Sequence, residues 1–197
     1  MSQAKKVFTR MCLNNWGGID HKVLEFHEYV NLFSGKSGSG KSTVMDAIQV
    51  ILYGSFSPSF LNKAADDAKN RRSVLSYLRG EQKDGSANRK DCDFCSVIAL
   101  EIEDTGTHII TCIGIAFEVR KSDSEIKKFV YFSHSGKMPE SEYLTEQGVC
   151  YSNQEIKKLV SARTKSDDNR GKGEVNRIYG SKEAYLGTLY DVILGYI

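Results

Sequence analysis

The residues best suited to chemistry form a glycine-rich loop that ends in a lysine and a serine. Its members are Gly35, Lys36, Ser37, Gly38, Ser39, Gly40, Lys41 and Ser42. Glycines allow the backbone to curl, so that successive N–H groups converge on an anion. Four residues separate the outer glycines and Lys-Ser follows at once, which predicts a cradle for nucleotide phosphates.

The charged and hydroxyl side chains at the end of this loop each have an expected role. Lys41 can reach the β- and γ-phosphates, Ser42 offers a hydroxyl to Mg²⁺, and Thr43 is placed to bond the α-phosphate. An apolar stripe from Val44 to Ile51 indicates a helix that starts at the loop, with its positive end facing the same anion. We therefore expect ATP and Mg²⁺ as the bound ligands.

Several short elements must position the loop. Three strands are expected ahead of it, at residues 7–13, 23–26 and 29–33. The third runs directly into the glycines. The helix after the loop is nearly all apolar and should lie under a sheet, with Gly54 as its stop signal. Trp16 is expected to pack in the core. A short helix over 73–78 and an exposed loop over 81–93 follow.

The second half of the sequence changes to a period of two. Alternating residues predict an antiparallel meander with strands at 94–102, 108–120 and 126–134. A helix over 153–162, a mobile loop over 163–174 and a last helix capped by Ser181 are expected to follow. The predicted fold class is α/β, with a mixed or antiparallel sheet packed on the P-loop helix and helices at the C-terminal end.

Composition sets the broad class. The chain has 197 residues, 40% of them hydrophobic and 26% charged, enough for one domain with a sizeable core. No apolar run approaches a membrane span, and no signal peptide is visible. Five irregularly spaced cysteines suit a reducing compartment, so a cytoplasmic protein without a membrane partner is expected. A net charge of +2 is too small to argue nucleic-acid binding.

Hydrolysis needs an acidic residue that helps to hold Mg²⁺, and the sequence offers one weak candidate. Residues 97–101 are four apolar or small residues followed by Glu101. The alternation continues through Ile102 and Glu103, which favours a half-exposed strand over a metal site. The catalytic carboxylates are therefore not expected in this chain.

Two other groups of residues have alternative interpretations. Cys92, Cys95, His108 and Cys112 have a zinc-like spacing, but in strands they would not converge, since His108 and Cys112 would lie ~13 Å apart. The basic stretch consists of Arg71, Arg72, Arg79, Lys83, Arg89 and Lys90. A solvated surface is the favoured interpretation, while contacts to DNA phosphates, or from one arginine to the nucleotide, stay open.

The loop and its helix resemble a known family. The order strand, Asn15-Trp16, two strands, residues 35–42 and then Val44-Met45-Asp46-Ala47-Ile48 looks like the N-terminal half of an ABC-type ATPase head of the SMC superfamily. The likeness covers most of the chain. This family often has Asn where Ser37 stands here, a mild departure because the backbone does most of the holding.

Shorter motifs are similar to one branch of that superfamily. They are Asn14-Asn15-Trp16-Gly17, Asn62-Lys63-Ala64-Ala65, residues 72–80 and Tyr185-Leu186. This branch is the JetC family, the MukB-like motor subunits of Wadjet plasmid-defence condensins. Residues 1–197 would then be the N-terminal half-head. The coiled coil, the hinge and the C-terminal half-head, with its signature motif and Walker B acid, would be absent.

The resemblance implies a mechanism and partners. Two heads would sandwich two ATPs, and hydrolysis would move or extrude DNA in the nucleoid. Partners would be the C-terminal half-head, a second copy of the protein, kleisin-type and accessory subunits, and DNA. Arg71 or Arg72 resembles the family's arginine that touches the nucleotide, and Gln154 is a possible Q-loop residue. Two alternatives remain: the ATPase of an SbcC-type DNA-repair nuclease, and a nucleotide-gated binding module without turnover.

Overall fold

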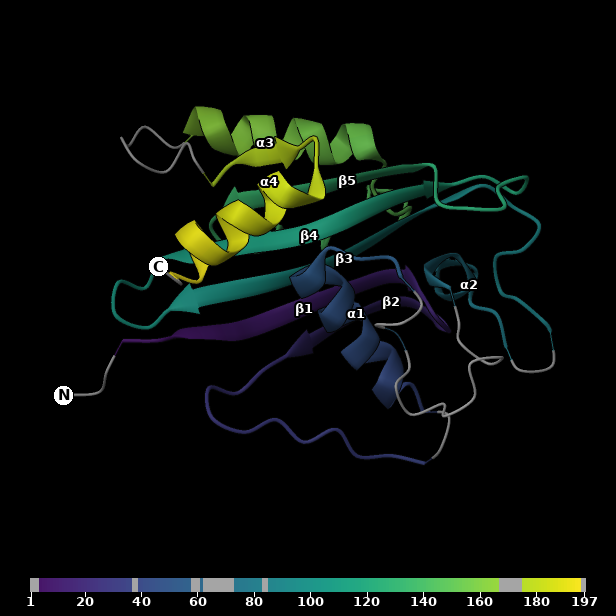
Figure 1. Ribbon diagram of the computed structural model, residues 1–197, viewed down its shortest axis with the longest axis horizontal. Coiled ribbons are helices and arrows are strands. Elements are labelled where there is room, and N and C mark those ends of the chain that lie inside the picture. The colour runs from purple at the N-terminus through teal and green to yellow at the C-terminus, as the bar shows by residue number, and fades with distance from the viewer. Residues whose placement is uncertain are drawn as a thin grey trace.

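One antiparallel sheet organises the part of the chain that the structure describes (Figure 1). The computed structural model describes residues 4–36, 39–57, 61, 73–82, 85–166 and 175–195. Six strands lie in the order β2-β1-β3-β4-β5-β6, and each neighbouring pair is antiparallel. The predicted α/β class with an antiparallel sheet packed on the P-loop helix is thereby confirmed.

The elements have the following bounds. The strands are β1 Lys6–Trp16, β2 Ile19–Glu25, β3 Phe94–Asp104, β4 Ile110–Val119, β5 Lys128–Ser135 and β6 Arg177–Tyr179. The α-helices are α1 Lys41–Tyr53, α2 Val74–Arg79, α3 Asn153–Ser166 and α4 Lys182–Gly187. A π-helical turn, η3 Thr188–Ile193, continues α4. The expected meander corresponds to β3, β4 and β5.

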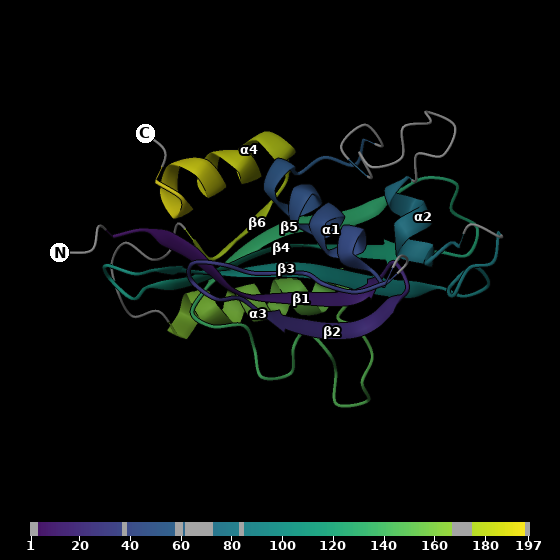
Figure 2. The ribbon, with the colours of Figure 1, turned by 90° about the horizontal axis from the view of Figure 1, so that it is seen from below.

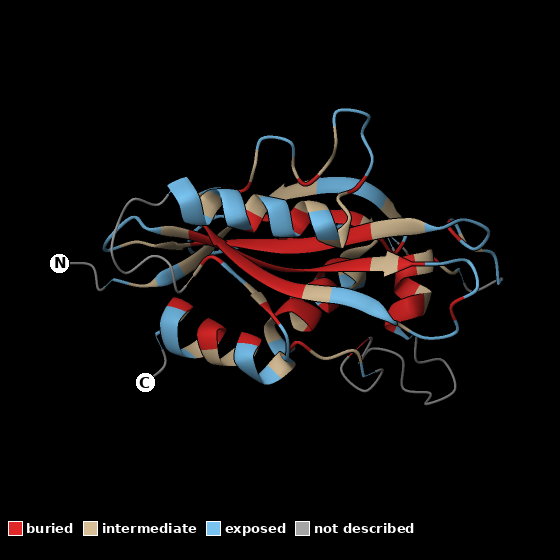
Figure 3. Ribbon diagram, turned by 90° about the horizontal axis from the view of Figure 1, so that it is seen from above, coloured by how far each residue is buried: buried red, intermediate tan, exposed pale blue. Residues whose placement is uncertain are grey.

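Helices cover both faces of the sheet (Figure 2). α1, α2 and α4 lie on one side, and α3 lies on the other. Alternate residues of β3 point to separate cores: Ile98 and Leu100 pack with the α1 side, whereas Val97 and Ala99 pack with the α3 side. The central strands are consequently buried along most of their length (Figure 3).

The expectation that β3 is half-exposed is therefore wrong. Seven of its consecutive residues, from Ser96 to Ile102, are buried. Period-two alternation marks which residues share a face, but it does not say whether a second layer covers the polar face. Here that layer is α3, whose Ile156 and Val160 are buried against the sheet.

Most local signals hold. Gly54 ends α1 in the left-handed conformation, with φ 55°. The Ser73 side chain caps α2, and the Ser181 hydroxyl accepts a 3.2 Å hydrogen bond from the backbone N–H of Ala184. Trp16 is fully buried, as expected. The helix expected at 153–162 is α3, which continues to Ser166, so residues 163–166 are helical rather than part of a loop.

The strand expected at 29–33 does not form. These residues are irregular, and three of their apolar side chains are strongly exposed: Tyr29 at 78%, Val30 at 76% and Leu32 at 87%. A strand needs a neighbour to take its backbone hydrogen bonds. No described strand lies beside this segment, so its backbone has no neighbouring strand to bond with, despite the β-propensity of its residues. The short strand β6 and the π-helical turn, by contrast, were not predicted.

Candidate nucleotide-binding site

The glycine-rich loop leads directly into α1. Of its members, the structure describes residues 35, 36 and 39–42; Ser37 and Gly38 lie outside the described residues, as does Arg72. The backbone N–H of Ser39 donates to the carbonyl of Lys36 at 3.2 Å, which makes a tight turn. Gly40 then takes φ 88° and ψ 8°, a left-handed conformation that favours glycine, immediately before the helix begins at Lys41.

The start of α1 is open to an anion. Gly40 supplies no side-chain cap, and the first turn contains no acidic residue. The first hydrogen bond inside the helix runs from Val44 N–H to the Gly40 carbonyl at 3.1 Å. The N–H groups of the preceding residues have no partner within the helix, and the positive end of the dipole lies at the same place. This donor set fits a phosphate group.

Lys41 places its charge over the loop. Its Nζ lies 2.6 Å from the Gly35 carbonyl oxygen, 2.9 Å from that of Lys36 and 3.3 Å from Ser39 Oγ. The loop is narrow here, since a Cβ on Gly35 would lie 2.6 Å from Ser39 Oγ. The Lys41 ammonium group therefore lies next to the start of the helix, surrounded by three oxygen acceptors. Phosphate oxygens bound there would compete with the carbonyl oxygens for its hydrogen bonds.

Ser42 and Thr43 lie in the first turn of α1, with Ser42 exposed and Thr43 half-buried. Trp16 holds this turn in place, because its indole Nε1–H donates to the Thr43 carbonyl at 2.9 Å. β1 also approaches closely: a Cβ on Gly17 would lie 2.5 Å from Thr43 Cγ2. The position of the loop therefore depends on the end of β1.

A buried carboxylate on α1 was not singled out by sequence reasoning. Asp46 is 4% exposed and accepts a hydrogen bond from the Tyr77 hydroxyl of α2. The Tyr77 ring stacks on Trp16, with centroids 5.1 Å apart and planes 12° from parallel. A lone acidic residue within an apolar stripe was the available signal. This contact joins the middle of α1 to α2.

Three tyrosine hydroxyls donate hydrogen bonds to carbonyls at the C-terminal end of α1. Tyr131 donates to the Gly54 carbonyl at 2.7 Å, Tyr185 to that of Ile51 at 2.9 Å, and Tyr190 to that of Leu52 at 2.9 Å. Burial raises the pKa of Tyr131 to about 12 and holds the pKa of Tyr185 well above its usual value. The hydroxyls of Tyr131 and Tyr185 therefore stay protonated, and all three hydroxyls satisfy carbonyls of the kind that every helix leaves open at its C-terminal end.

The candidate acid of the sequence analysis lies on the other face of the sheet. Glu101 is buried and shares the α3 side with Val97 and Ala99. Its carboxylate accepts hydrogen bonds of 2.7 Å from Thr9 Oγ1 and 2.7 Å from the Met138 N–H. It cannot help to hold an ion at the start of α1. These two hydrogen bonds explain how a carboxylate can be buried there.

The basic stretch divides into structural and exposed members. Arg89 is buried and donates to the Leu78 carbonyl at 2.9 Å and to Asp20 at 2.7 Å, while Arg79 donates to backbone carbonyls. Neither guanidinium fits the expected solvated surface or a DNA contact. Lys90 is exposed, and Arg71 and Lys83 lie outside the described residues.

The remaining candidates do not approach the loop. Cys92 precedes β3, and His108 sits in an exposed turn, 2.9 Å from Glu103. Within the described ranges, no three His, Cys, Asp or Glu residues are placed to share a metal ion. Gln154 is exposed on α3, across the sheet from α1. Among the helices in the described ranges, none is long and apolar enough to cross a membrane.

Comparisons with known proteins agree with this site. A family model described as the P-loop containing region of an AAA domain matches residues 8–68, which include most of β1 and all of β2, the loop and α1. The SbcC subunit of nuclease SbcCD from Staphylococcus haemolyticus is 39% identical over 74 residues. That match spans 36% of this chain and only 6% of the relative's length.

A structural comparison adds a weaker likeness. A solved structure from work on ATP-driven dimerization and DNA-stimulated activation of SMC ATPases covers 66% of this chain and 72% of its own, at 16% identity and a TM-score of 0.42. A score below 0.5 does not establish a shared fold. The loop geometry at the start of α1 and the match over residues 8–68 both indicate a P-loop.

Proposed function

We propose that this chain is the ATP-binding half of an SMC-type ATPase head. The observation that carries the proposal is the open start of α1, where Gly40 and Lys41 bring backbone donors and an ammonium group to one place. The P-loop model matched over residues 8–68 and the 39% identity to an SbcC protein support it. ATP is the proposed ligand.

Each residue of the loop has a defined task in this proposal. The backbone N–H groups of residues 35–42 bind the phosphates, Lys41 neutralises charge on the β- and γ-phosphates, and Thr43 bonds the α-phosphate. Ser42 offers its exposed hydroxyl to Mg²⁺, which would neutralise charge that develops on the leaving phosphates. Arg72 is proposed as a further contact to the nucleotide.

The exposed segment at 29–33 supports a half-head that another segment completes. Tyr29, Val30 and Leu32 leave apolar surface open directly before the loop, and Met45 and Tyr53 of α1 are 46% and 49% exposed. Unpaired β-prone backbone beside apolar side chains fits an added strand. We propose that a C-terminal half-head pairs there and supplies the acid that the sheet around α1 lacks among its described residues.

The finer proposal is an ATP-driven motor that moves or extrudes DNA in a Wadjet-type plasmid-defence condensin of the JetC family. A second copy would sandwich the nucleotides, and kleisin-type and accessory subunits would join the heads. The motifs at residues 14–17 and 72–80 support this branch. The protein would act in the cytoplasm, on the nucleoid.

A second candidate is the ATPase subunit of an SbcC-type DNA-repair nuclease, which the match to the SbcC protein of nuclease SbcCD favours. A zinc-hook Cys-x-x-Cys in the coiled coil of the full-length protein would support this candidate, and a hinge without a hook would support the condensin. A nucleotide-gated module is the third possibility, and it predicts ATP binding without phosphate release.

The decisive experiment compares Lys41→Ala with Lys22→Ala, an exposed lysine on β2. Both variants are co-expressed with the C-terminal half, and ATP affinity and phosphate release are measured. Loss of a charge-assisted contact should weaken ATP binding roughly 10- to 100-fold and abolish turnover. Lys22→Ala should behave as the parent protein does. Undiminished turnover in Lys41→Ala would refute the proposal.

A further inference from the structure

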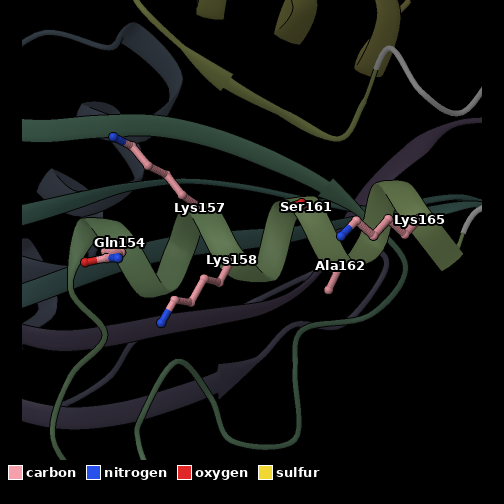
Figure 4. Close-up of a pocket in the computed structure, with 6 residues that line it drawn as sticks. All are labelled: Gln154, Lys157, Lys158, Ser161, Ala162 and Lys165. Carbon is pink, nitrogen blue, oxygen red and sulfur yellow. The ribbon is translucent and has the colours of Figure 1, made fainter.

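The outer face of α3 carries a row of polar and basic side chains. Six residues line a shallow hollow along it: Gln154, Lys157, Lys158, Ser161, Ala162 and Lys165. Their spacing of three or four residues places them on one side of the helix, opposite the buried Ile156 and Val160. Figure 4 shows these side chains along the helix, with the sheet behind it.

The positive charge of this row is not neutralised locally. None of the ion pairs found among the described residues involves Lys157, Lys158 or Lys165. The nearby carboxylate of Glu155 is used elsewhere, because it accepts a 2.7 Å hydrogen bond from the Ser152 N–H at the start of the helix. The exposed ammonium groups therefore present net positive charge to solvent.

A second hollow continues the surface towards the edge of the sheet. Lys157 lines both hollows, and the second adds Phe129, Tyr179 and Lys182 around β5, β6 and the start of α4. Within the part of the chain that the structure describes, no Asp or Glu lines either hollow. Four lysines, the exposed ring of Phe129 and the buried ring of Tyr179 line these two hollows. We call the six residues together the lysine surface: Lys157, Lys158, Lys165, Lys182, Phe129 and Tyr179.

The dimensions of the lysine surface suit a nucleic-acid backbone. Lys157 and Lys165 are eight residues apart on one helix, which corresponds to ~12 Å. Phosphates of one DNA strand follow one another at ~3.4 Å along the duplex axis, so the row extends along three or four of them. Flexible lysines contact phosphates as point charges and need no base sequence.

We propose that the lysine surface binds the phosphate backbone of double-stranded DNA without sequence preference. The choice of DNA rests on the proposed motor function, whereas the binding itself follows from the charge and spacing of the surface. The low overall charge of +2 is no obstacle, because four lysines and no described carboxylate line these hollows. The α3 part of the surface lies across the sheet from α1, and Lys182 lies beside Gly54 at the end of α1 far from the loop, so DNA and nucleotide would not compete for one site.

The test uses a labelled 30-base-pair duplex and the 197-residue chain at several salt concentrations. The triple variant Lys157→Gln, Lys158→Gln, Lys165→Gln should lose roughly tenfold in affinity near 0.1 M salt, and the slope of log affinity against log salt should fall by about 2 to 3. The matching Lys→Arg triple keeps the charges and should bind as the parent protein does.

A second triple variant with the same change of charge is the control. Lys22→Gln, Lys90→Gln and Lys121→Gln alter exposed lysines on other parts of the surface and should leave the salt slope within about 1 of the parent value. Equal losses in both triples would overturn the proposal, as would unchanged binding in the first. Equal binding of polyglutamate in place of the duplex would show an acidic protein partner instead.

Failure of this inference is distinguishable from failure of the proposed function. ATP affinity should be unchanged in the lysine-surface variant and weakened in Lys41→Ala, whereas DNA affinity should be weakened in the lysine-surface variant and unchanged in Lys41→Ala. Thermal unfolding of each variant confirms that the chain remains folded, because the substituted side chains are exposed.

Discussion

The hydroxyl of Tyr185 donates a 2.9 Å hydrogen bond to the carbonyl oxygen of Ile51, across 134 positions of sequence. Both groups are buried. This bond joins α4 to the last turn of the P-loop helix, and the hydroxyls of Tyr131 and Tyr190 make similar bonds to neighbouring carbonyls. The helix that presents the loop is thus held at its far end by tyrosines of β5, α4 and the π-helical turn.

Removing this hydroxyl should destabilise the protein. Tyr185→Phe leaves the buried Ile51 carbonyl without its donor, and the expected cost is about 1–3 kcal/mol. Urea denaturation followed by circular dichroism measures the change. Tyr151→Phe is the control, because that hydroxyl faces Ser141 in an exposed contact, and its cost should stay below about 0.5 kcal/mol. Equal effects would contradict the role given to Tyr185.

The left-handed glycine before α1 should matter for both stability and ligand binding. Gly40→Ala meets no atom within 4 Å, but its φ of 88° strains any other residue, at a cost of about 1–2 kcal/mol. Because the strain moves the loop backbone, ATP affinity should fall as well. Calorimetry measures both quantities.

Gly85→Ala is a matched control for that variant. Gly85 also has open space around it and a φ of 83°, yet it lies in the turn after α2. It should lose comparable stability while its ATP affinity stays at the parent value. A loss of affinity in both variants would show that global destabilisation, rather than the shape of the loop, is responsible.

Arg89 should behave as a structural residue. Its guanidinium donates to two backbone carbonyls and to Asp20 from a buried position. A lysine cannot reproduce this fork of donors, so Arg89→Lys should destabilise the protein by about 2–4 kcal/mol. The salt slope of DNA binding should not change. Lys90→Arg, at the exposed neighbouring position, should alter neither quantity.

The buried His134 should make stability depend on pH. Burial lowers its pKa from 6.5 to about 4, against the opposing effect of its hydrogen bond to the Ser135 carbonyl. The other ring nitrogen accepts from the Tyr143 hydroxyl. Between these values the unfolded chain binds the proton that the folded chain rejects. Stability therefore falls as the pH decreases from 6.5 to 4, by roughly 3 kcal/mol from this group.

A neutral replacement isolates that contribution. His134→Gln cannot titrate in this range, so the difference in unfolding free energy between parent and variant should shrink as the pH is lowered. Urea denaturation at pH 7, 5.5 and 4.5 gives the three values. A difference that stays constant with pH would contradict the assignment, even if the variant is less stable throughout.

Local sequence patterns predicted the elements that form by themselves. The spacing of glycines, Lys41 and Ser42 indicated the loop, the apolar stripe after it indicated α1, and the period-two alternation indicated the meander. Gly54 and Ser181 marked helix ends correctly. These signals depend only on residues close in sequence and on the chemistry of each side chain. They can therefore be recognised without the tertiary structure.

Tertiary structure decided what those elements meet. Residues 29–33 have a strand pattern but no described partner strand, so they remain irregular and exposed. Glu101 occupies a polar position in the period-two pattern of β3, as a surface residue would. It is nevertheless buried, because α3 and the segment after β5 cover that face. Hydrogen-bond partners and covering layers come from residues distant in sequence, and a local pattern carries no information about them.

The lysine surface and the tyrosines around α1 illustrate the same division. The sequence by itself determined a glycine-rich P-loop and the helix that follows it. Only the folded chain joins Lys157 to Lys182 in one continuous surface, and Tyr185 to the end of α1. The physical reason is that a sheet brings distant segments together by pairing their backbones, which no periodicity within one segment encodes.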